Sequence, residues 1–123
     1  MSKKPNKLIY TLLESAKKIE NLSEKENLSS FLSSDSWVSR EAVARRFLIM
    51  ASISEILLEK HEPFCMKYPE IPFNAMRGMK SYLSKIHDGD IDWAIVWQTT
   101  QKEIPRIIEQ LADTLGELRA ENC

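Results

Sequence analysis

The sequence predicts an all-α fold, an antiparallel bundle of four to five helices that forms one domain over residues 1–123. Apolar residues recur at spacings of three and four along most of the chain, as expected for amphipathic helices. The chain has only 3 glycines and 5 prolines, too few turn-forming residues for a many-stranded β fold. Its 43% hydrophobic and 28% charged residues fit one globular domain.

The first half of the chain contains three predicted helices. An apolar stripe indicates a helix from Leu8 to near Asn21, and the Ser23–Glu26 spacing resembles a capping box for a short second helix. The serine-rich segment 33–36 is expected to form a turn before a third helix. The apolar edge of the second helix consists of Leu28, Phe31 and Leu32.

The third helix starts near Trp37 and continues to Glu59 with a small polar face, so we expect it to be central and shared with a second copy of the chain. A charge close to a core usually faces a cleft or a partner. This makes its few polar side chains candidates for a site: Arg45, Arg46, Ser52 and Glu55.

The second half begins with a proline-rich connection, 61–74, which we expect to be extended, with Pro72 opening a fourth helix that reaches Ile86. Asp90 or Asp92 then caps a last long helix that Pro105 should kink. The seam of the last helix comprises Trp93, Trp97, Thr100, Ile104, Ile107, Leu111, Leu115 and Leu118.

Charge and motifs narrow the function classes. The net charge of −1 excludes a strongly basic nucleic-acid coat, so contact with a polyanion requires a local cluster of cations. The sequence contains no phosphate loop, dinucleotide fingerprint, HExxH or CxxC motif. Two distant cysteines, no signal sequence and no long apolar run favour a cytoplasmic protein without a membrane span.

The fourth helix carries the strongest chemical signal. At 100° per residue, Arg77, Lys80, Ser84 and His87 fall on one strip of its surface. Arginine and lysine would stabilise a phosphodiester, and an imidazole would move the proton of a ribose 2′-hydroxyl. The same strip is also what an amphipathic helix presents to solvent, so the pattern leaves both readings open.

Two other groups have simpler explanations. His61 and Cys65 could supply two zinc ligands, but no second pair follows, and we expect no metal and no cofactor. The aromatic side chains Tyr82, Trp93 and Trp97 could stack RNA bases, although their helical spacing fits a core or an interface better.

Three segments, Ala42–Ile49 (AVARRFLI), Tyr68–Leu83 (YPEIPFNAMRGMKSYL) and Asp90–Ile108 (DIDWAIVWQTTQKEIPRII), resemble the HepT-like ribonuclease toxins of the HEPN superfamily. The resemblance covers about 70 residues in the right order. It implies a HEPN-like helical homodimer with an RNase site at the dimer interface. It also implies a minimal nucleotidyltransferase antitoxin as a partner.

The catalytic signature of that family, an arginine, four to six residues, a histidine, one residue and a tyrosine, is changed here. Aligning Gly78 and Met79 with the family's Gly-Met places Lys80 at the arginine position. The shortest spacing then places Lys85 at the histidine position and His87 at the tyrosine position. The longest spacing instead pairs Lys80 with His87 and places Gly89 at the tyrosine position. Lysine cannot bind phosphate bidentately, so Lys80 is a weaker clamp than arginine.

The resemblance implies metal-independent RNA cleavage, weakened or lost by these changes. His87 would then be the acid or base, with Arg77 and Lys80 stabilising the phosphate. The RNA-binding residues would be Lys85, Ser84, Arg45 and Arg46. The alternative is a non-catalytic helical homodimer that binds a nucleotidyltransferase partner, a nucleotide or RNA.

Overall fold

The computed structural model describes residues 4–84 and 91–121, and within these ranges the chain is helical without strands. This confirms the predicted all-α class. The helices are α1 (Pro5–Glu24), α2 (Leu28–Leu32), η1 (Ser34–Ser36), α3 (Trp37–Lys60), α4 (Glu62–Lys67), α5 (Phe73–Leu83), α6 (Trp93–Lys102) and α7 (Ile104–Glu121). η1 is a single 3₁₀ turn.

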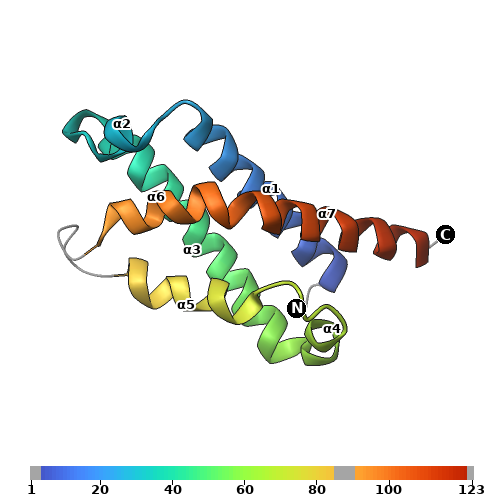
Figure 1. Cartoon of the computed structure of the whole chain (residues 1–123). Helices are drawn as coiled ribbons and strands as arrows, with labels where there is room; N and C mark the ends of the chain where they lie inside the picture. Colours follow the sequence, from blue (N-terminus) through green and yellow to red (C-terminus); the bar gives the residue numbers. More distant parts are fainter. Residues whose placement is uncertain (1–3, 85–90, 122–123) are drawn as a thin grey trace.

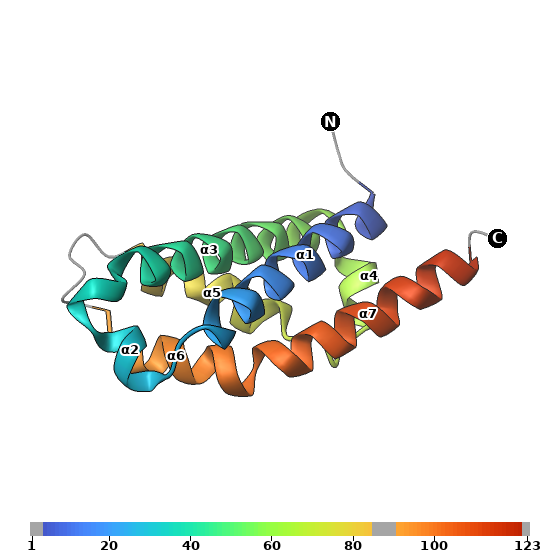
Figure 2. The same ribbon diagram turned by 90° about the horizontal axis from the view of Figure 1, so that it is seen from above.

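The long helices run antiparallel along the bundle, in the order α1, α3, α5 and then α6 with α7 (Figures 1 and 2). α3 is the central helix, because α5 and α1 both pack against it, and α1 also packs against α7. The predicted central position of α3 is therefore confirmed. None of the described helices combines the length and the hydropathy needed to cross a membrane.

The core is apolar and draws on every long helix. α3 contributes Val43, Phe47, Met50 and Leu57, which lie between α1 and α5. The fully buried side chains of α1 and α7 include Ile9, Leu12, Ile19, Ile104 and Leu111. Burying side chains of this kind contributes roughly 1.5–3 kcal/mol each.

The short elements α2 and η1 close one end of the bundle, and α2 lies next to α6 (Figures 1 and 2). The ring of Phe31 lies 5.2 Å from that of Trp97 and 6.3 Å from that of Trp93. The Arg40 guanidinium donates hydrogen bonds to the carbonyl oxygens of Phe31 and Ser33, at 2.7 Å and 2.5 Å. These contacts fix α2 to both α3 and α6.

The capping prediction for α2 is wrong in its residues. Asn27 forms the capping box, since its side chain accepts from the Ser30 N–H and Ser30 accepts from the Asn27 N–H. α1 continues to Glu24, so Ser23 lies in its last turn and donates to the Glu20 carbonyl. Asparagine and serine are both favoured at helix N-caps, and the sequence has Ser23 and Asn27 near the start of α2.

The connection 61–74 is not extended throughout, because it contains α4. Pro63 lies in the first turn of α4, where a missing N–H costs nothing. Pro72 is the N-cap of α5 and so directly precedes its first residue.

The last predicted helix is divided into α6 and α7 at Glu103. Pro105 is the second residue of α7. It has no N–H to donate to a carbonyl of α6, so the helical hydrogen bonds of α6 do not continue through it. The sequence predicted a kink within one helix, and the structure has a break between two helices. Asp92 caps α6 as expected, accepting from the Ala94 and Ile95 N–H groups. Asp90, the alternative cap, lies outside the described residues.

Replacing Phe31 by alanine should lower the free energy of unfolding by about 3–5 kcal/mol, because the ring is fully buried between α2 and α6. Urea unfolding followed by tryptophan fluorescence measures this change. Leu28→Ala is the matched control, since Leu28 lies on the same short helix and is 47% exposed. Equal losses in the two variants would show that the aromatic contact does not hold this end.

Candidate functional site

Helix α5 holds the basic strip predicted from the sequence. Its side chains Phe73, Met76 and Leu83 are buried, and α5 packs on α3. The opposite side is exposed and carries Arg77 and Lys80. The apolar spacing of α5 therefore decides that these two cations face away from the core.

Arg77 is held along the helix by its neighbour one turn earlier. Its Nη2 donates a hydrogen bond to the Asn74 side-chain oxygen at 2.9 Å. A guanidinium has five N–H donors, so this contact leaves most of them for a ligand. Arg77 is thus oriented and still able to bind an anion.

Lys80 is exposed, and its side chain reaches an acidic residue of α3. Its Nζ lies 3.6 Å from the Glu55 carboxylate, and the two side chains are 49% and 36% exposed. The sequence marked Glu55 as a polar residue on an apolar helix, but it did not show that Glu55 pairs with Lys80. This acidic partner offsets part of the positive charge of the strip.

Of the three other positions predicted near this strip, the structure describes Ser84. Ser84 is exposed and ends the helix, with its backbone N–H donating to the Lys80 carbonyl. Lys85 and His87 lie outside the described residues. The structure therefore places Arg77 and Lys80 within α5 and Ser84 at its C-terminal end, and it does not describe the predicted acid or base.

Arg45 and Arg46 lie on a different side of α3 from this strip. Arg46 and Glu55 are nine residues apart, and at about 100° per residue they point in opposite directions. Arg45 is exposed, whereas Arg46 is half-buried and lines a hollow against α1. Neither lies beside Lys80, so the two arginines assigned to RNA binding lie apart from the lysine assigned to catalysis.

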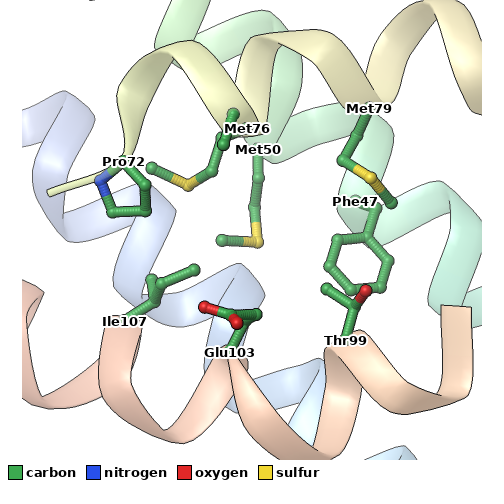
Figure 3. Close-up of a pocket in the computed structure, with 9 residues that line it drawn as sticks. Phe47, Met50, Pro72, Met76, Met79, Thr99, Glu103 and Ile107 are labelled. Carbon is green, nitrogen blue, oxygen red and sulfur yellow. The ribbon is translucent and has the colours of Figure 1, made fainter. Parts of the chain in front are cut away.

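An apolar cavity of about 220 Å³ lies between α5 and the α6–α7 junction (Figure 3). Phe47 and Met50 of α3 line it together with Met76 and Met79 of α5. Glu103 supplies a carboxylate at its edge, and none of its lining residues is a cation. A phosphate would gain no charge-assisted contact from this lining.

The aromatic residues near the end of α5 belong to the core region, as the sequence favoured. Trp93 and Trp97 are half-buried against Phe31, and the Asp92 N–H donates to the Tyr82 hydroxyl at 2.8 Å. These contacts join α5 to the start of α6. The side chains are thus engaged in packing rather than arranged as a platform for bases.

His61 is the N-cap of α4, and Cys65 lies within this helix. The Cys65 N–H donates to the His61 carbonyl, and the thiol is buried. Burial raises the pKa of the Cys65 thiol, and the nearby Glu62 carboxylate raises it further. At neutral pH this thiol stays protonated, which makes it a poor nucleophile and a poor metal ligand.

Comparison with known proteins identifies the family. The model of the ribonuclease HepT-like family matches residues 12–114, from the first turns of α1 to the middle of α7. The chain belongs to the ribonuclease HepT-like family. The resemblance found in the sequence is therefore confirmed at the level of the family.

Curated relatives carry names that agree with this assignment. A protein of Methanocaldococcus jannaschii named "Putative RNase MJ0127" is 24% identical over 114 residues, which covers 93% of this chain and 89% of the relative. "Putative RNase MJ1216" of the same organism is 25% identical with the same coverage. No solved structure gave a significant match.

The ion pair between Glu55 and Lys80 should contribute about 0.2–1 kcal/mol to stability, because both side chains are partly exposed. A double-mutant cycle with Glu55→Gln and Lys80→Met, measured by urea unfolding, gives this coupling free energy. The coupling should shrink in high salt, since ions screen exposed charges.

Glu59→Gln combined with Lys80→Met is the control cycle, because Glu59 is exposed on the same helix and makes no ion pair with described residues. A coupling of equal size in both cycles would mean that the measured term reflects general charge and not this contact.

Proposed function

We propose that the chain is a HepT-like RNase toxin of a toxin–antitoxin system that cleaves RNA without a metal ion, at a cleft shared by two protomers. The observation that carries this proposal is the exposed pair Arg77 and Lys80, held on the outer side of α5 in a chain of the ribonuclease HepT-like family. The names of the relatives, which describe RNases, support the same reaction class.

The reaction is an intramolecular transesterification at a phosphodiester of RNA. The 2′-oxygen attacks the adjacent phosphorus, the bond to the 5′-oxygen breaks, and the products carry a 2′,3′-cyclic phosphate and a 5′-hydroxyl. His87 takes the proton of the 2′-hydroxyl or delivers one to the leaving 5′-oxygen. Arg77 and Lys80 stabilise the negative charge that grows on the phosphate oxygens.

The contact between Lys80 and Glu55 has a chemical consequence for this proposal. A bound phosphate must compete with the Glu55 carboxylate for the ammonium group, which lies 3.6 Å from it. Lysine binds a phosphate as a point charge and not through two parallel hydrogen bonds. Both effects weaken the clamp, so we expect cleavage slower than that of a chain with arginine at position 80.

Lys85, Ser84, Arg45 and Arg46 are proposed to hold RNA outside the bond that breaks. Ser84 is the exposed end of α5, and the long side chain of Arg45 would reach the cleft between the two protomers from α3. We propose that the protein acts on RNA in the cytoplasm.

A second copy of the chain is proposed to pack against the outer side of α3. Val38 and Ile56 are 59% and 42% exposed there, and both point about 80° away from Arg46 on the side of Arg45. Exposed apolar side chains on a central helix are favourable contacts for a twofold interface. Two protomers joined in this way would share one cleft.

A non-catalytic binding module is the second candidate function. The specific observation in its favour is Lys80, which replaces the arginine of the family signature and is already paired with Glu55. Such a module would keep the homodimer and bind a minimal nucleotidyltransferase antitoxin, a nucleotide or RNA.

Purified protein should cleave single-stranded RNA in the presence of EDTA and leave 2′,3′-cyclic phosphate ends. His87→Ala should lose about 10²- to 10⁴-fold in rate, the usual contribution of a general acid or base. Lys80→Arg should raise the rate. His61→Ala is the matched control, since His61 is the only other histidine and lies at the start of α4.

Cleavage that is unchanged in His87→Ala would remove His87 from the mechanism. A wild-type chain that cleaves no RNA but forms a stable complex with a nucleotidyltransferase would support the binding module instead.

The wild-type protein should sediment with twice the mass of the chain, and Ile56→Asp should convert it to monomers, because a carboxylate would be buried without a partner. Sedimentation velocity measures both states. Met66→Asp is the control, since Met66 is also an exposed apolar residue but lies on α4. A monomeric wild-type chain at all concentrations would contradict the shared cleft.

A further inference from the structure

A second group of cations lies far from α5, where α1 packs on the first half of α3. A hollow of about 280 Å³ is lined there by Lys18 of α1, by Lys25, the C-cap of α1, and by Arg46 of α3. Asn21 lies between the two lysines along α1 and lines the same hollow. The floor is made by Leu22 and Ala42, which are half-buried.

The helix period explains why these side chains meet. Lys18, Asn21 and Lys25 are separated by three and four residues, so they lie on one side of α1. Ala42 and Arg46 are one turn apart on α3. Because α1 and α3 run antiparallel, the last turns of α1 face the first half of α3 (Figure 2).

The cations of this hollow have no acidic partner in the part of the chain that the structure describes. Within residues 4–84 and 91–121, none of Lys18, Lys25 and Arg46 takes part in an ion pair. No hydrogen bond engages the Arg46 guanidinium in these ranges, although the residue is half-buried. Like charges that converge repel one another, and a bound anion would reverse the sign of this interaction.

The helix end explains only part of this charge. Lys25 is the C-cap of α1, where a cation interacts favourably with the helix dipole. Lys18 lies well inside α1, and Arg46 lies in the middle of α3, so neither gains from a helix end. The contrast with Lys80, which has Glu55 beside it, sets this hollow apart.

We propose that the hollow formed by Lys18, Lys25 and Arg46 binds phosphate groups of the RNA backbone, at a distance from the bond that is cleaved. The identity of the anion as RNA rests on the proposed function. The guanidinium can hold a phosphate through two hydrogen bonds, and the two ammonium groups add charge. No aromatic side chain lines the hollow, so it grips the backbone without reading bases.

The hollow extends the RNA contact across α3. Arg46 and Glu55 lie on opposite sides of that helix and about 14 Å apart along its axis, at 1.5 Å per residue. An RNA strand that reaches both groups must therefore be longer than the two nucleotides that flank the cleaved bond. The hollow would make the protein select long single strands over short ones.

The test is the salt dependence of RNA binding. A fluorescent, single-stranded 2′-O-methyl RNA is the probe, because it has no free 2′-hydroxyl and cannot be cleaved. Replacing Lys18, Lys25 and Arg46 by glutamine should reduce the slope of log affinity against log salt by about 2, since each phosphate contact contributes about 0.7 for a single strand. Fluorescence anisotropy over a salt series gives the slope.

The control variant carries Lys7→Gln, Lys60→Gln and Lys102→Gln, which remove the same charge from exposed positions elsewhere. Its slope should stay close to that of the wild type. Lys18→Arg, Lys25→Arg and Arg46→Lys together should also keep the slope, because they preserve the charge. Far-UV circular dichroism checks that each variant folds.

An unchanged slope in the glutamine variant of the hollow would overturn the proposal, and so would an equal loss in the control variant. Because the readout is binding, a wild-type chain that binds RNA without cleaving it would overturn the proposed RNase and leave this site standing. If the wild-type chain cleaves RNA and the glutamine variant of the hollow keeps the salt slope of RNA binding, the proposed RNase would stand and the proposed site in the hollow would be overturned.

Discussion

The packing of α3 between α1 and α5 is the constraint on which the rest of the structure depends. Residues such as Val43, Phe47 and Leu57 are buried along one side of this helix, and the flanking helices cover them. The outer side is left exposed, with Arg45 at its centre. The cationic residues of both regions and the exposed apolar side chains of α3 are all arranged around this one helix.

The electrostatics follow from that arrangement and not from the net charge of −1. On one side of α3, Glu55 offsets Lys80 and moderates the positive strip of α5. On the other side, Arg46 meets two lysines of α1 without an acidic partner among the described residues. A nearly neutral protein thus has two cationic regions. In one, a carboxylate offsets part of the positive charge, whereas in the other no carboxylate of the described residues does so.

The break between α6 and α7 lets both helices pack against the same core. α6 packs under α2 at one end of the bundle, while α7 packs along α1. One straight helix would have a single axis for both contacts, and Pro105 allows the axis to change at Glu103. α5 lies across from this junction, and the apolar cavity occupies the space between them (Figure 3).

The sequence by itself determined the all-α class, the long helices, a cap at Asp90 or Asp92, an interruption at Pro105 and the family. These features depend on local spacing, on side chains that bond to nearby backbone groups, or on residue order, all of which can be read along the chain. α4 and the Asn27 capping box were missed because a proline in a first turn and two competing caps give ambiguous local signals.

Only the tertiary structure decided which residues meet across helices. Periodicity shows that Lys80 and Glu55 each lie on the surface of a helix, but not that these surfaces face each other. The same holds for Arg46 with Lys18 and Lys25, which are far apart in sequence and meet through the packing of α1 on α3. A helical repeat defines the side on which a residue lies, whereas its neighbour depends on how the helices pack.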